Sequence, residues 1–279
     1  RRQRVGPPKL ILARFFFKKR VGFYWISIGL RKYQFAAKHV VFVIGQIFRQ
    51  LIDIIIGDFN FGVRILSKNL RSPLNKHLAS SDLFFGPETT TANRALIGGM
   101  IGNNSCGLHS IVWGSTRDHL IETRAWLSDG TEIHTEALSI DAFYTKTSLT
   151  NLEGKIYREL HRMLNNPEVQ TLIRNSFPKS EIKRRNTGYA LDALIEMQPF
   201  NPEGSPFNLS ALIAGSEGTL AVVHAAKLNL LNKPEPFVGL LCLHCHSLQD
   251  ALQANILALN NNPTASELVD DFILSFTEH

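Results

Sequence analysis

The stretch Ile97-Gly98-Gly99-Met100-Ile101-Gly102-Asn103-Asn104-Ser105-Cys106-Gly107 decides the fold class of this chain. Its glycines and small polar residues let the backbone turn sharply and approach a ligand closely, with amide groups free to face phosphate or ring oxygens. A glycine-rich turn between strands is the alternative interpretation. The chain has no G-x-x-x-x-G-K-[ST] stretch, and no G-x-G-x-x-G follows a strand here. We therefore expect a binding loop that is neither of the familiar phosphate loops.

Further recognisable sequence features lie on both sides of this stretch. Gly86-Pro87 precedes it, and a helix over 74–78 is expected just before Leu83. Gly114-Ser115-Thr116-Arg117-Asp118-His119 follows it, and residues 120–133 then alternate between apolar and polar side chains. The alternation is interrupted at Asp129-Gly130, which is typical of a β-hairpin.

Two further motifs lie downstream. The first is Arg184-Arg185-Asn186-Thr187-Gly188-Tyr189, and the second is Gly215-Ser216-Glu217-Gly218-Thr219. Between the hairpin and the first motif, residues 151–175 place apolar side chains at helical intervals and predict an inserted helix. After Pro236, the pattern predicts a strand over 238–243 and a helix from 247 or 248 to 260, apolar at Leu248, Ala251, Leu252, Ile256 and Leu259.

These motifs, in this order over residues 83–234, resemble the FAD-binding domain of the vanillyl-alcohol oxidase / p-cresol methylhydroxylase superfamily. The likeness is greatest to the FAD-linked D-2-hydroxyacid dehydrogenases, a group that acts on D-lactate, glycolate or D-2-hydroxyglutarate. The resemblance implies an α+β fold: the second part of a p-cresol methylhydroxylase-type FAD-binding domain, followed by the start of an α+β, ferredoxin-like cap. It implies three segments, a basic segment of irregular or helical structure (1–80), the FAD-binding domain (81–233) and an incomplete cap (234–279). A reductase of the UDP-N-acetylmuramate type, from the same superfamily, fits the arginine motif (184–189) and the Gly215–Thr219 motif less well.

The resemblance also implies a set of cofactor-binding residues, with backbone amides rather than charged side chains on the pyrophosphate. Small side chains here let the backbone approach FAD closely. The implied positions are Pro87, Gly98, Gly99, Gly102, Asn103, Ser105 and Gly107 in the first loop, Ser115, Thr116, Asp118 and His119 in the next turn, and Gly218 and Thr219 at the flavin edge. His119 could equally be a strand-end histidine bonded to the backbone.

Substrate binding is expected from the arginine motif. A 2-hydroxyacid carries a carboxylate, which an arginine can bind through two parallel hydrogen bonds. Arg185 is the preferred candidate over Arg184, with Tyr189 beside the flavin or in the core; a solvated basic run is the alternative. The catalytic residues stay unknown, because the cap histidines of the family are expected beyond His279.

Three cysteines, Cys106, Cys242 and Cys245, form no disulfide framework, which favours a reducing compartment. Cys106 lies beside the loop glycines, but we expect the FAD to be non-covalent. Cys242, His244 and His246 would share one face of a strand and could chelate a metal. We favour a half-buried strand of the cap and expect no metal.

The charge is unevenly distributed. Residues 1–80 hold 16 Lys and Arg against 2 acidic residues, whereas residues 81–279 hold 14 against 22. The first segment suits a partly helical basic arm, a surface that lies on anionic membrane, or a displaced reading frame. Its aromatic residues are clumped rather than interleaved with the basic ones, so nucleic-acid binding is not expected. Its apolar runs are too short for a membrane-spanning helix.

The composition, 44% hydrophobic and 19% charged, excludes collagen, coiled coil and general disorder. The family resemblance implies a cytoplasmic flavoenzyme, with peripheral attachment to the inner face of the cell membrane as an option. It would oxidise a D-2-hydroxyacid and pass electrons to a quinone or cytochrome. The family's first glycine-rich FAD loop cannot be found in residues 1–80, so we expect an incomplete form. A non-catalytic membrane- or partner-binding remnant of a flavin domain is the alternative.

Overall fold

The structure is a computed structural model of the 279-residue chain. It describes residues 70–277 except 180, 183, 186, 187 and 237, together with the backbone of three strands before residue 70. Among these residues no helix has the length and apolar character needed to cross a membrane.

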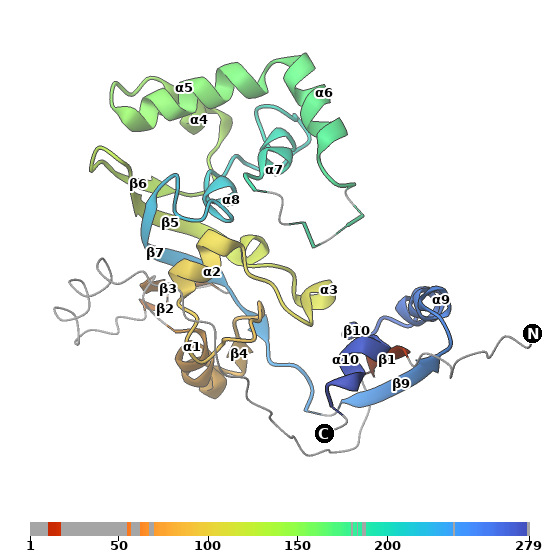
Figure 1. Cartoon of the computed structure of the whole chain (residues 1–279). Helices are drawn as coiled ribbons and strands as arrows, with labels where there is room; N and C mark the ends of the chain where they lie inside the picture. Colours follow the sequence, from red (N-terminus) through yellow and green to blue (C-terminus); the bar gives the residue numbers. More distant parts are fainter. Residues whose placement is uncertain are drawn as a thin grey trace, which may run out of the picture.

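A five-stranded antiparallel sheet lies at the centre of the chain, in the order β2–β3–β7–β5–β6 (Figure 1). Its strands are β2 (Ile55–Ile56), β3 (Gly62–Leu66), β5 (Leu120–Trp126), β6 (Glu132–Thr135) and β7 (Val222–Asn229). β5 and β6 form the predicted hairpin, in which Thr123 pairs with Thr135. β7 lies between β3 and β5, so the Gly215–Thr219 motif leads directly into the middle of the sheet.

Short helices pack on this sheet and close the first hydrophobic core. They are α1 (Arg71–Leu78), α2 (Ile97–Asn103) and α3 (Ser110–Trp113), with 3-10 turns η1 (Ala79–Ser81) and η2 (Arg117–His119). A two-stranded ribbon of β4 (Leu83–Phe84) and β8 (Leu231–Asn232) accompanies them. Leu74 and Leu78 of the predicted helix α1 are buried against Met100 and Ile101 of α2 and the strands of the sheet. The binding stretch is thereby fixed to the sheet.

A helical layer caps the hairpin end of the sheet (Figure 1). Its helices are α4 (Ile140–Thr147), α5 (Leu152–Leu164), α6 (Pro167–Ser176), α7 (Leu191–Ile195) and α8 (Ser210–Ile213). The inserted helix predicted over 151–175 is helical but is divided into α5 and α6. The Asn151 side chain accepts a hydrogen bond from the Gly154 amide at the N-terminus of α5. Pro167 then begins α6, a position that suits its fixed φ and missing N–H.

The helical layer encloses a second hydrophobic core, and one polar group in this core lacks a hydrogen-bond partner among the described residues. Tyr157 is fully buried, and its ring packs edge-on against Phe143 and Phe207. Its hydroxyl has no hydrogen-bond partner among the described residues. Burial and the charges of Glu153 and Glu136 raise the pKa of Tyr157, so the phenol stays protonated.

Tyr157→Phe is therefore expected to stabilise the chain, since a buried hydroxyl without a partner costs about 1–3 kcal/mol. An increase in Tm of about 2–4 °C corresponds to roughly 1 kcal/mol in a chain of this size. Thermal unfolding should show this increase, and Tyr144→Phe, whose ring is exposed, should leave Tm unchanged. A lower Tm for Tyr157→Phe would mean that an ordered water holds the hydroxyl.

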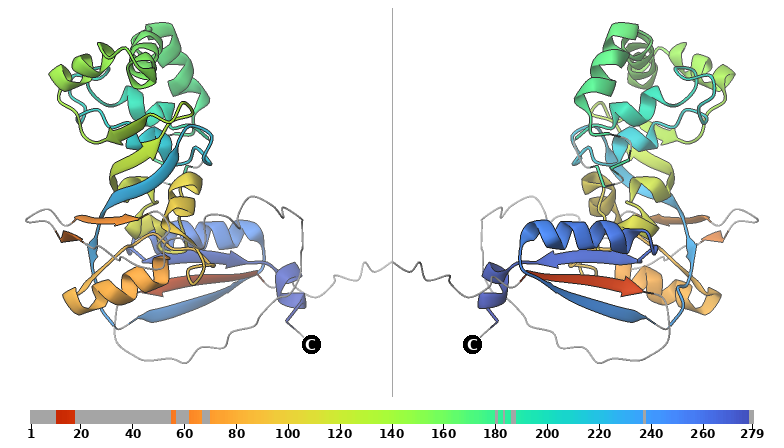
Figure 2. Two further views of the ribbon diagram at one scale, coloured as in Figure 1. Left: turned by 90° about the vertical axis from the view of Figure 1, so that its left-hand side faces the viewer. Right: turned by 90° about the vertical axis from the view of Figure 1, so that its right-hand side faces the viewer.

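The C-terminal part forms a second, smaller sheet in the order β10–β1–β9 (Figure 2). Its elements are β1 (Ile11–Phe17), β9 (Gly239–Cys245), α9 (Leu248–Leu259), β10 (Ala265–Val269) and α10 (Asp271–Ser275). Both outer strands run antiparallel to β1, so β9–α9–β10 is a split βαβ unit. The strand and the helix predicted after Pro236 are confirmed as β9 and α9.

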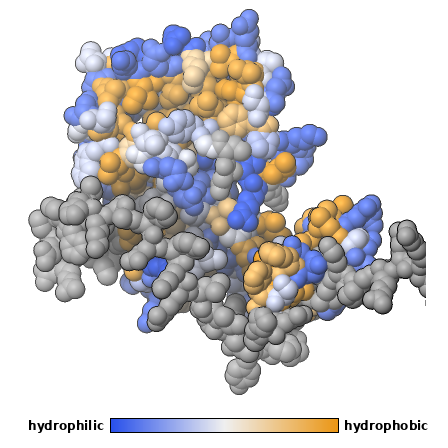
Figure 3. All heavy atoms as spheres, viewed as in Figure 1, coloured by the Kyte–Doolittle hydropathy of each residue, from blue (hydrophilic) through white to orange (hydrophobic). Residues whose placement is uncertain are grey.

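The orientation of α9 differs from the sequence expectation. Ala251 and Ala258 are buried against the small sheet, whereas Leu252 and Ile256 are 51% and 63% exposed. Apolar surface accordingly gathers on α9 and α10 (Figure 3). The helical period was recognised correctly, but the face that packs on the sheet carries the small residues.

The N-terminal segment also differs from the expectation of irregular or helical structure. Before residue 70 its described parts are the strands β1, β2 and β3, rich in the β-branched and aromatic residues that favour strands, whereas its last part is helix α1. β1 pairs with β9 and β10, and β3 pairs with β7. These partners lie far away in the sequence, which is why no local pattern revealed them. The remaining expectations for residues 1–69, the basic arm, the membrane surface and the displaced frame, lie outside the described residues.

Candidate functional site

Helix α1 holds the segment that leads into the glycine-rich stretch. The Asn75 side chain pairs with the backbone of Phe85: its Nδ2 donates to the carbonyl at 3.1 Å, and its Oδ1 accepts from the amide at 2.7 Å. Arg71 Nε donates to the Pro87 carbonyl at 2.6 Å. These bonds fix Pro87 and Glu88 relative to the core. The sequence predicted helix α1, but no signal revealed what Asn75 and Arg71 do.

The glycine-rich stretch itself is only partly a loop. Ile97–Asn103 forms helix α2, and the turn follows at Asn104, which has a left-handed backbone with φ of 47°. A Cβ atom added at Gly99 would meet nothing within 4 Å, whereas one at Gly107 would lie 2.5 Å from Cβ of Glu88. Gly107 therefore permits a close approach of two chain segments, and Gly99 leaves open space on the surface of α2.

The Gly215–Thr219 motif docks on the end of α2. The Gly215 amide donates to the Ile101 carbonyl and the Glu217 amide donates to the Gly102 carbonyl, both at 2.9 Å. Gly215 has φ of +88°, a conformation that L side chains rarely adopt. Two motifs more than a hundred residues apart thus form one structural unit, as the family resemblance implied.

Arg117 ties this unit to the intervening turn. Its backbone amide donates to Asn104 Oδ1 at 2.8 Å, its Nε to the Ala211 carbonyl at 2.9 Å and its Nη2 to the Ala214 carbonyl at 2.6 Å. Burial lowers the pKa of Arg117, and the carboxylates of Asp192 and Asp118 oppose this shift. Arg117 lies within the Gly114–His119 motif, but no signal in the sequence predicts these contacts.

The turn over 115–119 is held by its own side chains. Thr116 is buried and its hydroxyl donates to the Ser105 carbonyl at 2.7 Å. Asp118 Oδ2 accepts from the amide and the hydroxyl of Ser115 at 2.7 and 2.9 Å. His119 is buried, with Nε2 2.7 Å from the Trp113 carbonyl. These bonds show how the turn is fixed; contact of its residues with a cofactor stays a prediction.

A cavity of about 1000 Å³, which we call the main cavity, lies beside the glycine-rich stretch. Of the predicted cofactor residues, Gly99, Asn103, Ser105 and Gly107 line it. Its remaining lining comes from the segment 88–92, Ala95, Leu96, Met100, Cys106, Leu108 and three charged residues, Arg71, Arg184 and Glu267. Gly98, Gly102 and Gly218 border a separate cavity of about 180 Å³ on the other side of α2.

The two predicted substrate residues lie apart from this main cavity. Arg185 forms an ion pair with Asp192 at 2.6 Å and borders a separate cavity of about 440 Å³, together with Asp118 and His119. The Tyr189 hydroxyl lies 2.8 Å from the Thr219 hydroxyl. Arg184, the less favoured candidate, is the arginine of this motif that lines the main cavity. Asn186 and Thr187 lie outside the described residues.

A carboxylate–imidazole pair lies at the edge of the main cavity. Glu88 Oε2 lies 2.7 Å from His109 Nδ1, and the His109 ring stacks on Trp113 with centroids 4.3 Å apart. Burial alone would raise the pKa of Glu88, but the hydrogen bonds from His109 and the charges of His109 and Arg71 outweigh it and hold the pKa below its ordinary value. Glu88 is therefore an anion at neutral pH.

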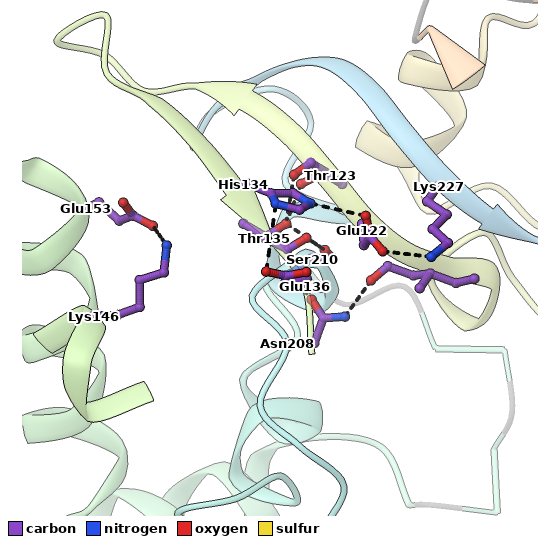
Figure 4. A network of polar contacts seen from close by, with 11 residues as sticks. Glu122, Thr123, His134, Thr135, Glu136, Lys146, Glu153, Asn208, Ser210 and Lys227 are labelled. Carbon is purple, nitrogen blue, oxygen red and sulfur yellow. Dashed lines mark hydrogen bonds and ion pairs between the residues drawn. The ribbon is translucent and has the colours of Figure 1, made fainter. Parts of the chain in front are cut away.

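A second polar network lies on the β5–β6 sheet (Figure 4). Glu122 contacts His134 Nε2 at 3.1 Å and Lys227 Nζ at 3.0 Å, and Glu136 lies 3.8 Å from His134 Nδ1. Among the described residues, this is the group of three whose atoms lie close enough to hold a metal ion. Because Lys227 already compensates Glu122, we interpret the group as an ion-pair network. Cys242 and His244 lie on β9 and are exposed, whereas a half-buried strand was expected.

Comparisons with known proteins identify the class. Residues 71–136 match the family model described as "FAD binding domain". D-2-hydroxyglutarate dehydrogenase of Pseudomonas putida is 33% identical over 212 residues, 76% of this chain and 20% of that protein. The enzymes of that name from Escherichia coli and Haemophilus influenzae are 34% and 32% identical, over 62% and 77% of this chain and 16% and 20% of theirs.

A solved alkyldihydroxyacetonephosphate synthase is 15% identical, with a TM-score of 0.35, over 63% of this chain and 20% of that one. The chain is similar to these D-2-hydroxyglutarate dehydrogenases and spans about a fifth of the length of the P. putida relative.

Proposed function

We propose that this chain binds FAD without a covalent bond in the main cavity and serves an enzyme that oxidises a D-2-hydroxyacid to the 2-oxoacid. The observation that carries the proposal is the docking of the Gly215–Thr219 motif on α2, beside the turn that Arg117 fixes. Together with the family match over residues 71–136, it supports a cofactor site built from the predicted motifs.

The cavity fits the cofactor in size and in lining. About 1000 Å³ lies at the upper end of the usual range for ligand pockets, and FAD is a large ligand. Gly99 leaves the space open that a side chain would fill, and Gly107, which also lines the cavity, lets its backbone pack closely against Glu88. We propose that Gly99, Asn103, Ser105 and Gly107 contact FAD, and that Thr116 positions Ser105.

Bound flavin would supply a two-electron acceptor for the hydroxyacid. The chain's own contribution is to orient and charge the site. Asn75 and Arg71 fix the Pro87–Glu88 segment, and Glu88 keeps the His109 ring oriented through Nδ1. Arg184 faces the same cavity and can hold a carboxylate through two parallel hydrogen bonds. Glu267 of β10 brings the cap to the cavity edge.

The substrate and the electron acceptor extend this proposal. The relatives are named for D-2-hydroxyglutarate, so we propose this acid before D-lactate or glycolate. A quinone or cytochrome as acceptor, and peripheral attachment to a membrane, follow from the family resemblance and the basic residues before position 70.

Anaerobic reduction of the FAD-loaded chain tests the activity. Adding D-2-hydroxyglutarate should bleach the flavin's visible absorption, and D-lactate and glycolate should bleach it more slowly. L-2-hydroxyglutarate, the mirror-image acid, is the matched control and should leave the spectrum unchanged. Retained FAD with no bleaching by any D-2-hydroxyacid would contradict the oxidation and leave the binding proposal standing.

A further inference from the structure

Arg71 is the most unusual charged group of the main cavity. It lies at the first position of α1, is half-buried and lines the cavity. Its Nε donates to the Pro87 carbonyl at 2.6 Å, which fixes the direction of the guanidinium plane. For the described residues, this is the single side-chain hydrogen bond of Arg71, so its terminal nitrogens keep their donors available.

The nearest carboxylate does not neutralise Arg71 directly. Glu88 is close enough to act on Arg71 through its charge, but its Oε2 is engaged by the ring and the backbone amide of His109, at 2.7 and 3.3 Å. Within the described part of the chain, no carboxylate oxygen lies within 4.0 Å of the Arg71 guanidinium. A half-buried cation without a close counter-ion favours an anionic ligand.

We propose that Arg71 binds anionic oxygens of the ligand in the main cavity. Its planar group, oriented by Pro87, matches the oxygens of a phosphate or a carboxylate. Two sources offer that chemistry, the diphosphate of the flavin nucleotide and the carboxylates of the hydroxyacid. The inference rests on the proposed FAD site and differs from the expectation that backbone amides alone hold the pyrophosphate.

The test compares ligands with and without phosphate. Wild type, Arg71→Gln and Arg94→Gln would be titrated with FAD, riboflavin and inorganic pyrophosphate, following tryptophan fluorescence. Gln can keep a hydrogen bond to Pro87 while losing the charge. Arg94 is exposed, lies near the same segment and does not line the cavity, so Arg94→Gln is the matched control.

Arg71→Gln is expected to weaken FAD and pyrophosphate binding about 10–100-fold, the scale of hydrogen bonds to a charged group. Riboflavin binding should stay unchanged, and the dependence of FAD affinity on salt should become shallower. Arg71→Lys, which keeps a point charge, should retain part of the affinity. If FAD binding is unchanged but the FAD-loaded variant binds D-2-hydroxyglutarate more weakly, the carboxylate is the source.

Three outcomes would overturn the proposal. Equal losses for FAD and riboflavin would mean that Arg71 acts through Pro87 alone. Unchanged affinity of Arg71→Gln for FAD, riboflavin, pyrophosphate and D-2-hydroxyglutarate would show that Arg71 binds none of them, and would leave the FAD proposal intact. A wild type that binds neither flavin nor pyrophosphate would overturn both the FAD proposal and the Arg71 proposal. Binding of pyrophosphate alone, weakened by Arg71→Gln, would overturn only the proposal that the cavity holds FAD.

Discussion

Replacing Arg117 with leucine is expected to disrupt the contact between the Gly98–Gly107 and Gly215–Thr219 motifs and to abolish flavin binding. The change leaves the carbonyls of Ala211 and Ala214 without their donors. Each buried carbonyl that loses its partner costs about 1–3 kcal/mol, so the free energy of unfolding should fall by about 2–6 kcal/mol. That range is a large fraction of the 5–15 kcal/mol typical of a whole domain.

Urea unfolding of Arg117→Leu measures this loss, and Arg124→Leu is the matched control. Arg124 is exposed on β5 and should change stability by less than about 0.5 kcal/mol. Arg117→Lys should fall between the two, because one ammonium cannot donate to both carbonyls in the geometry of the guanidinium. A stability of Arg117→Leu equal to that of wild type would contradict the role of Arg117.

Gly99→Ala is expected to separate stability from binding. Alanine is favoured over glycine inside a helix by about 1 kcal/mol, and the added methyl group meets no protein atom within 4 Å. The thermal midpoint should therefore rise. The same methyl group projects into space that the bound FAD would need, and such overpacking costs about 1–3 kcal/mol, or roughly 10–100-fold in FAD affinity.

Thermal unfolding and FAD titration of the same Gly99→Ala preparation check both effects. Gly102→Ala locates the flavin independently, because a Cβ atom there would lie 3.7 Å from Cα of Glu217, an ordinary contact away from the main cavity. Loss of FAD binding in Gly102→Ala with normal binding in Gly99→Ala would place the flavin on the other side of α2. Lower stability of Gly99→Ala would contradict the helical environment of Gly99.

The sequence predicted those elements whose partners are close in the chain. The β5–β6 hairpin, helix α5 and the β9–α9 pair each carry a complete local pattern of alternation, helical period or turn residues. The convergence of the Gly98–Gly107 and Gly215–Thr219 motifs was predicted from the family resemblance, because it depends on contacts between residues far apart in the chain.

The sequence did not predict features that tertiary contacts decide. α2 is helical although glycines occupy three of its seven positions, because Met100 and Ile101 are buried in the first core and override the low propensity. Arg71, Asn75 and Arg117 act on backbone carbonyls and amides, which carry no sequence signature. Arg185 carried the stronger expectation, but its partner is Asp192 and Arg184 faces the main cavity.

The most direct test of the central claim is a titration of the purified, desalted chain with FAD, followed by visible absorption and tryptophan fluorescence. We expect saturable binding of one FAD per chain, released on denaturation because no covalent bond forms, and weakened by Gly99→Ala. No binding of FAD by a chain that circular dichroism shows to be folded would contradict the proposed site.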